Sequence, residues 1–257
     1  MQISQALCLF ALAVLGLLGA EWVQAGIVLD RTRVVFSAGQ REVSVAVVND
    51  GDLPYLLQAW IGTDPEHGLP ETSSAPFHIV PPLQRINAGA RESLRILQLP
   101  GMLPSDRESL FWLSVLAIPG HVADGPVDAG RLDMAIQTNI KVFYRPVGMG
   151  PLETGREGSL RLSLQRKQGT CLLRVENPSP LHLSIAGMSV IEGAQRAGVW
   201  PDGVMLLPRS LTTVEVPDAC QGEVAGPAKA RMEIINDQGV IQHVDTAVDG
   251  PPRGGTP

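Results

Sequence analysis

The sequence lacks the motifs that carry catalysis in many enzyme families. No GxSxG, HExxH, P-loop or CxxC pattern occurs in its 257 residues, and its five histidines show no metal-ligand spacing. Asp106 and Glu108 lie close together, but we expect them at the start of a strand rather than in a general acid–base pair. We therefore expect no enzyme activity, no metal, no cofactor and no small-molecule substrate.

An excess of basic residues is also missing. The chain has 20 Lys and Arg against 26 Asp and Glu, which gives a formal net charge of −6. A surface that binds nucleic acid needs a basic excess, so no nucleic-acid partner is expected.

The sequence has no apolar run long enough to span a membrane. The run at residues 6–20 has 15 residues, whereas a membrane-spanning helix needs about 20. Val23-Gln24-Ala25 follows it and has the small-residue pattern of a cleavage site. We predict a signal peptide over residues 1–25, removed after about Ala25. No Lys or Arg precedes the run, which is atypical, and an uncleaved membrane anchor is the alternative.

The sequence contains only three cysteines. Cys8 lies in the predicted signal peptide, which leaves Cys171 and Cys220. An even pair in an exported chain favours a disulfide, worth about 2–4 kcal/mol of stability. Two buried free thiols are the alternative.

The sequence shows no apolar periodicity of amphipathic helices. Apolar and polar residues instead alternate with the period of two that is typical of β-strands. The first half contains seven short strand-like runs separated by turn signals, at residues 27–36, 41–50, 55–61, 77–86, 91–99, 109–119 and 134–146. Pro81 and Pro82 cannot donate ladder hydrogen bonds, so their run must be an edge or bulged strand. The second half repeats the all-β pattern. The fold class predicted is all-β, with two seven-stranded antiparallel sandwiches.

Composition also places the domain boundaries. The first domain is predicted over residues 26–147, a hinge over 148–158, the second domain over 159–248 and a disordered tail over 249–257. The hinge glycines lack GxGxxG spacing and no helix follows them, so we do not expect a nucleotide there. Two modules joined by a short hinge are expected to lie at an angle and to leave a cleft.

The last run of the first domain has two unusual features. Leu132, Met134 and Ile136 begin a long apolar row, and Lys141 lies between apolar neighbours near its other end. On the first run, Arg33 immediately precedes Val34-Val35-Phe36. A cation there is unfavourable unless it is paired or lines a cleft. If the two runs meet, Arg33 and Lys141 form a site for a carboxylate or phosphate. The alternative is two surface residues with buried stems.

Several segments together resemble a known family. VLDRTRVVF, NDGDLPYLLQAWI, LPSDRESLFWLSVLAIP, AIQTNIKVFYRP, NPSPLHLSI and IINDQG occur in order over essentially the whole mature chain. They resemble the periplasmic chaperones of the chaperone–usher pilus pathway, close to the P-pilus type. The resemblance implies two immunoglobulin-like domains in a boomerang. It also implies a periplasmic location and two kinds of partner, pilus subunits and an outer-membrane usher.

The resemblance also assigns roles to residues. Leu132, Met134 and Ile136 match the donor strand, which lends apolar side chains to a subunit that lacks its own last strand. Arg33 and Lys141 match the pair that anchors the subunit's C-terminal carboxylate. A third group, Glu108, Arg145 and Asp237, matches a salt-bridge network that spans the two domains.

Some features depart from the P-pilus type. The loop GHVADGPVDAGR, residues 120–131, is slightly longer, although its length still favours the short-loop class. Asn139 stands where close relatives carry Lys, and the predicted Cys171–Cys220 disulfide is not at the expected place.

Other functions stay open at this point. One is a two-module adhesin, but such a module has no use for the Arg33–Lys141 pair and would more often carry exposed aromatics, which are only 4% of this chain. Another is the same chaperone fold with a client other than a pilus. Self-association of the free protein is plausible in either chaperone, because an exposed apolar edge is a liability.

Overall fold

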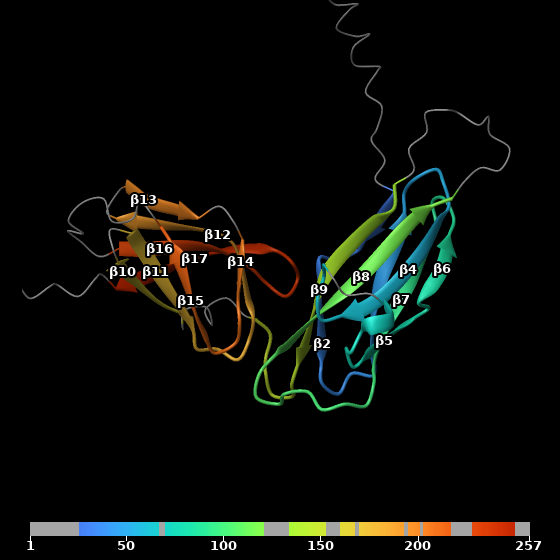
Figure 1. Ribbon diagram of the computed structural model, residues 1–257, viewed down its shortest axis with the longest axis horizontal. Coiled ribbons are helices and arrows are strands. Elements are labelled where there is room, and N and C mark those ends of the chain that lie inside the picture. Colours follow the sequence, from blue (N-terminus) through green and yellow to red (C-terminus); the bar gives the residue numbers. More distant parts are fainter. Residues whose placement is uncertain are drawn as a thin grey trace, which may run out of the picture.

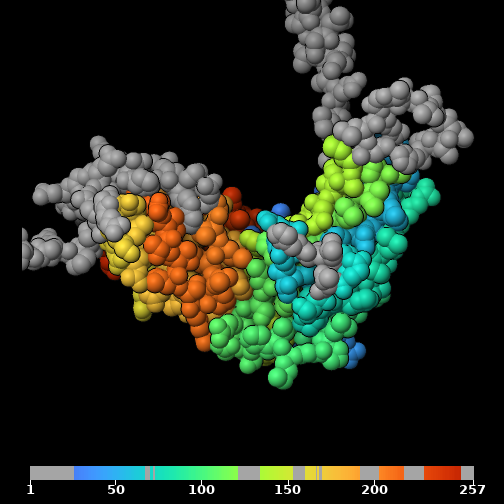
Figure 2. Space-filling view, in the orientation of Figure 1, coloured from blue at the N-terminus to red at the C-terminus, as the bar shows by residue number. Residues whose placement is uncertain are grey.

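The computed structural model describes residues 26–66, 70–120, 134–152, 160–167, 170–192, 195–200, 203–216 and 228–249. They form two β-sandwiches whose long axes meet at an angle (Figure 1). The space-filling view shows a concave face between the two domains (Figure 2). No helix in these ranges is long and apolar enough to cross a membrane. Several predictions concern residues outside these ranges. They are the signal peptide, Leu132, residues 121–131 of the loop on which the short-loop prediction rests, most of the hinge and most of the tail.

The first domain packs two sheets against each other. The strand order is β1-β3-β7-β5 in one sheet and β2-β9-β8-β4-β6 in the other. A single 3-10 turn, η1 (Pro70–Thr72), lies between β4 and β5. The strands are β1 (Ile27–Leu29), β2 (Arg33–Ser37), β3 (Glu42–Asn49), β4 (Tyr55–Gly62), β5 (Phe77–Val80), β6 (Leu83–Ile86), β7 (Arg91–Gln98), β8 (Ser109–Pro119) and β9 (Ile136–Arg145).

Period-two alternation explains how these strands build a core. Val45 and Val47 on β3 and Leu94 and Ile96 on β7 are fully buried, whereas the residues between them face outward or are only partly covered. Phe77 packs edge-on against Phe36 and Phe111, with ring centroids 5.3 and 5.1 Å apart, and so joins the two sheets. The predicted all-β sandwich is confirmed, although the described part of this domain has nine strands rather than the seven predicted.

Two of the predicted runs divide between the sheets. The run 27–36 becomes β1 in one sheet and β2 in the other, because the chain crosses over at residues 30–32. The run 77–86 divides at Pro81-Pro82 into β5 and β6, each at the edge of its sheet. Proline has no N–H for a ladder bond, so the chain leaves one sheet there and joins the other.

Strand β9 has a neighbour on one side only for half of its length. Along Ile136–Ile140 it pairs with β8 alone, and β2 joins it only over Lys141–Arg145, in parallel. In the described part of the chain, nothing pairs with the other edge of residues 136–140. This half of β9 therefore presents unpaired backbone groups.

Among its described residues the second domain has eight strands, one more than predicted, which are hydrogen-bonded in one continuous order. Their order is β13-β12-β16-β17-β10-β11-β15, with β14 also paired to β12. Its core holds Cys171, which is buried and disulfide-bonded, whereas Cys220 lies outside the described residues and the predicted pairing stays a prediction. The strands are β10 (Arg161–Lys167), β11 (Thr170–Asn177), β12 (Leu183–Glu192), β13 (Gln195–Trp200), β14 (Val204–Leu206), β15 (Ser210–Glu215), β16 (Ala228–Ile235) and β17 (Ile241–Asp249).

Each domain contains a fully buried asparagine at the end of a strand. The Asn49 side-chain amide closes β3 and donates to the carbonyls of Leu53 and Asn87, at 2.8 and 3.0 Å. The Asn177 amide, at the end of β11, donates to the carbonyls of Leu181 and Leu207, at 2.8 and 2.9 Å. Each amide thus satisfies carbonyls that the turns leave without a ladder partner.

Replacing Asn49 with Asp should destabilise the first domain. The substitution keeps the shape but turns the donating amide into an acceptor that faces carbonyl oxygens. We expect a loss of about 2–4 kcal/mol of unfolding free energy, measured by urea denaturation. Asn87→Asp is the matched control, because its side chain is exposed. Equal losses in the two variants would contradict this role of the amide.

Candidate functional site

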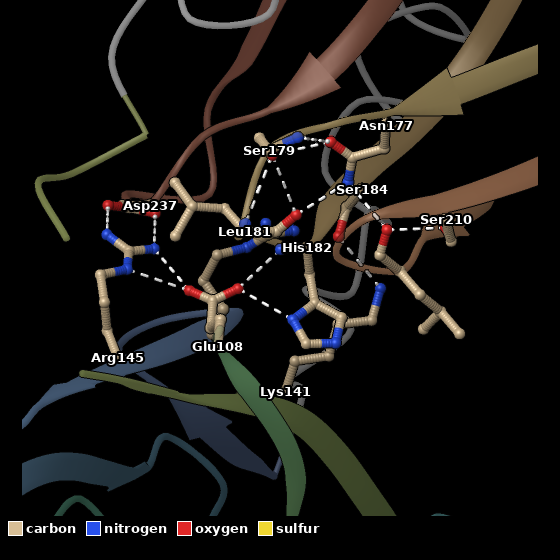
Figure 3. Close-up of polar contacts among 12 residues, drawn as sticks. Glu108, Lys141, Arg145, Asn177, Ser179, Leu181, His182, Ser184, Ser210 and Asp237 are labelled. Atoms are coloured by element: carbon tan, nitrogen blue, oxygen red, sulfur yellow. Dashed lines mark hydrogen bonds and ion pairs between the residues drawn. The ribbon is translucent and has the colours of Figure 1, made fainter. Parts of the chain in front are cut away.

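A buried ion-pair network joins the two domains. Arg145 is the last residue of β9, Glu108 directly precedes β8, and Asp237 lies in the turn between β16 and β17. The Arg145 guanidinium donates to Glu108 Oε1 through Nη2 at 2.8 Å and to Asp237 Oδ2 through Nη1 at 2.6 Å (Figure 3). Arg145 is only 4% exposed and Glu108 only 2%. The structure thus brings together the three residues predicted to span the domains.

The charges in this network depend on one another. Burial acts to lower the Arg145 pKa, but the hydrogen bonds and charges of Asp237 and Glu108 outweigh it and raise that pKa above its ordinary value. Removing one partner of such a buried pair leaves an uncompensated charge, which costs about 3–5 kcal/mol. Asp237 also accepts the Leu152 N–H at 3.1 Å, so the network holds the hinge as well.

His182 is a fourth member of this network that sequence reasoning missed. Glu108 Oε2 accepts the backbone N–H of His182 at 2.8 Å and lies 2.9 Å from its ring Nδ1. The ring is also 5.6 Å from that of Phe143 on β9. A lone histidine without metal-ligand spacing gives no sequence evidence of a role. The one pointer to His182 was that it lies in NPSPLHLSI, a segment that resembles the family.

Arg33 and Lys141 lie beside each other at the domain interface. They are direct register partners of the parallel β2–β9 pair. Arg33 Nη1 donates to the Ile235 carbonyl of the second domain at 3.0 Å, and its guanidinium carbon is 5.8 Å from the Phe143 ring centroid. The expected meeting of the first and last runs therefore takes place.

Lys141 is held in a similar way. Its Nζ lies 3.3 Å from Ser184 Oγ of the second domain and 5.7 Å from the Trp112 ring centroid (Figure 3). Within the described ranges, neither Lys141 nor Arg33 forms an ion pair with a carboxylate, and the Nε of Arg33 is buried without a partner.

The electrostatics of this pair favour an anion. Burial lowers the Lys141 pKa, and the charge of the adjacent Arg33 lowers it further. Burial also lowers the Arg33 pKa, against the opposite effect of Asp237 and Glu108. Two partly desolvated cations without a counter-ion form a site that a carboxylate can fill with charge-assisted hydrogen bonds. No cluster of metal-binding side chains occurs among the described residues.

The apolar row on β9 is exposed at one end and buried at the other. Met134 and Ile136 are 63% and 60% exposed, whereas Ile140 and Val142 of the same row lie in the core. Leu132, the third residue predicted for this row, is outside the described residues. The exposed part coincides with the half of β9 that has an open edge.

The fold and this interface define a two-domain immunoglobulin-like protein with two adjacent cations between its domains, and comparison with known proteins places it in a family. The family model described as "Pili and flagellar-assembly chaperone, PapD N-terminal domain" matches residues 26–150. The model "Pili assembly chaperone PapD, C-terminal domain" matches residues 156–246. The chain therefore belongs to the family of PapD-like pili-assembly chaperones, whose named role is not an enzymatic one.

Individual relatives agree. The chain is 32% identical to the probable fimbrial chaperone YadV of Escherichia coli K12, over 84% of this chain and 87% of that protein. It is 35% identical to the chaperone protein PapD of Escherichia coli, over 74% and 77%. Among solved structures, the YadV chaperone superposes with a TM-score of 0.68 at 30% identity, covering 87% and 100%. The SafB chaperone of Salmonella enterica, solved with the SafA pilin, superposes at 0.67 with 26% identity, covering 89% and 97%.

Replacing Lys141 with Met should stabilise the free protein. Because the folded-state pKa of Lys141 is lowered, the folded chain holds this proton less tightly than the unfolded chain, and the charged lysine reduces stability at neutral pH. This penalty falls as pH rises above the lowered folded-state pKa, and it is gone only above the ordinary pKa of the unfolded chain. We expect the Tm of Lys141→Met to exceed that of the wild type by about 2–4 °C at pH 7 and by less at pH 10.

Lys229→Met, at an exposed position on β16, is the control and should leave the Tm unchanged. A lower Tm for Lys141→Met would mean that the contacts with Ser184 and Trp112 outweigh the desolvation of the ammonium group.

Proposed function

We propose that this pilus-assembly chaperone works in the periplasm by donor-strand complementation. It binds a pilus subunit that lacks its last strand, completes the subunit's fold with β9 and delivers it to an outer-membrane usher. The observation that carries the proposal is the coincidence of three features on one strand: an exposed apolar row, an open backbone edge and a cation without a counter-ion.

The open edge and the exposed row fit an incomplete sandwich. Such a subunit exposes an apolar groove together with unpaired backbone groups, both of which promote aggregation. A strand added to the groove satisfies the backbone, and its alternate side chains fill the groove. Each apolar side chain buried in this way contributes about 1.5–3 kcal/mol before the cost of ordering.

Two side chains on the unpaired half of β9, residues 136–140, form hydrogen bonds that help to hold it in place. Asn139 Nδ2 donates to the Pro65 carbonyl at 3.1 Å, and Gln137 Nε2 donates to Asn139 Oδ1 at 2.9 Å. The strand is therefore extended before a subunit arrives, which lowers the entropy cost of binding.

The anchor cations supply the register. A shift of one residue turns every donor side chain to the wrong face, so the subunit needs a fixed end. The C-terminal carboxylate of a subunit would bind between Arg33 and Lys141, at the interface of the two domains. Lys141 is five residues from Ile136, about 17 Å along a strand, so anchor and donor row hold different parts of one extended segment.

Removing either anchor cation should abolish capture of the subunit. We would express the protein with the major pilus subunit encoded beside it and purify complexes from the periplasm, comparing wild type with Arg33→Ala and Lys141→Ala. We expect a soluble one-to-one complex with wild type only, because each variant loses half of the carboxylate site.

Lys229→Ala is the matched control, and circular dichroism checks that every variant is folded. Equal capture by all variants would refute the anchor. If none of the proteins, wild type included, captures the subunit, then the client is not this subunit.

A charge in the donor row should abolish capture without affecting the fold. Ile136 is exposed in the free protein, so Ile136→Asp should change the unfolding free energy by less than about 0.5 kcal/mol. In the complex the same side chain would be buried unpaired in the subunit groove. Leu211→Asp, on an exposed position of β15, is the control. Normal capture by Ile136→Asp in the periplasmic pull-down would show that β9 is not the donor strand.

A further inference from the structure

Arg209 has an unusual backbone in the turn that leads into β15. Its φ of +50° is in the left-handed region, and it is the only non-glycine residue there among the described residues. An arginine side chain is disfavoured in this conformation, which glycine adopts readily. The Arg209 N–H donates to the Ser179 carbonyl at 2.9 Å, which fixes the turn. Residues kept in such conformations often serve a function, so the side chain is the part to examine.

The Arg209 side chain reaches across to the first domain. Nη1 donates to Asp106 Oδ2 at 2.9 Å, and Nη2 donates to the backbone carbonyl of Asp106 at 3.1 Å. Two donors of one guanidinium thus hold both the side chain and the main chain of a single residue. Asp106 is two residues before Glu108, so this contact holds the same segment as the buried network does.

The contacts between the domains follow a line across the start of β12. Leu183 on β12 pairs with Leu206 of β14, and Ser184 pairs with Ile235 of β16. The turn that carries Arg209 follows β14, and the turn that carries Asp237 follows β16, so the two turns lie on opposite sides of β12. Figure 3 shows the same arrangement, with Asp237 at one side, His182 in the middle and Ser210, the neighbour of Arg209, at the other side.

A single attachment allows rotation, whereas separated attachments prevent it. The Arg145–Asp237 pair holds one side of β12, and Glu108 holds the middle through the Pro180 carbonyl and His182. Only the Asp106–Arg209 pair, among the described contacts, holds the other side. Loss of this pair would give the second domain more freedom to rotate about the remaining contacts, which include those of Arg33 with Ile235 and of Lys141 with Ser184.

We propose that the Asp106–Arg209 pair is an interdomain latch that stops this rotation and keeps Ser184 and Ile235 of the second domain against the two anchor cations. Arg209 is therefore a positioning residue, and it acts on subunit binding without touching the subunit. In its effect on capture, the latch rests on the function proposed above. Its effect on domain orientation does not.

The backbone of Arg209 makes a sharp test possible. Arg209→Gly removes the latch and also relieves the left-handed strain, so the Tm should equal or exceed that of wild type. Residual dipolar couplings should nevertheless show a less ordered orientation of the two domains. A captured subunit should dissociate about threefold to fivefold faster, the size expected for an ion pair whose side chains are 51% and 45% exposed.

Two further variants separate the latch from a merely structural turn. Asp106→Ala leaves the turn of the second domain intact and removes the side-chain ion pair, while the Asp106 carbonyl that accepts from Nη2 remains. It should therefore reproduce most of the effects of Arg209→Gly on orientation and dissociation. Adding the substitution at position 106 to Arg209→Gly should change nothing further, because the loss of the Arg209 side chain already removes every contact of the pair. Exchanging the charges, Asp106→Arg with Arg209→Asp, should restore part of the interdomain order.

The outcomes distinguish this inference from the proposed function. If Arg209→Gly keeps the dipolar couplings of wild type, the latch is refuted whatever happens to capture. If wild type itself captures no subunit, the donor-strand proposal fails, and the couplings still decide whether the latch exists.

Discussion

A guanidinium buried between carboxylates from two different domains holds this molecule in its shape. Arg145 ends β9, and its position decides where the rest of that strand lies relative to the second domain. Lys141, four residues earlier on β9, is thereby placed opposite Ser184. An ion pair in this environment is sensitive to geometry, because a buried charge that loses its partner is strongly unfavourable. The relative orientation of the domains is thus specified more sharply than an apolar interface alone would specify it.

Strand β9 combines roles that conflict in an ordinary sandwich. Its last residues complete the core and join the network, while its first residues leave an edge and apolar side chains open to solvent. The anchor cations, likewise, are partly desolvated without a counter-ion. Both features reduce the stability of the free protein, and in the proposed function both would become favourable when a strand with a terminal carboxylate binds. Part of the free energy of subunit binding would therefore come from the relief of these two unfavourable features.

Sequence reasoning recovered the residues with a strong local pattern. Arg33 and Lys141 stood out because each cation interrupts an apolar stretch, and the structure places them side by side. The runs at 27–36 and 77–86 were each predicted as one segment, yet the chain changes sheets within both. His182 and Arg209 were missed, since a lone histidine or a turn arginine shows its partner only after the domains meet.

By itself, the sequence determined the all-β class, the two-domain organisation and the family, because alternation, turn residues and motifs are local properties of the chain. It also determined which cations needed a special environment. Only the tertiary structure decided that β2 begins beside Lys141 and leaves residues 136–140 open, and that Glu108 contacts His182. Those features depend on contacts between residues more than 70 positions apart, such as Glu108 and His182. Strand pairing and domain docking set such contacts, and no local pattern encodes them.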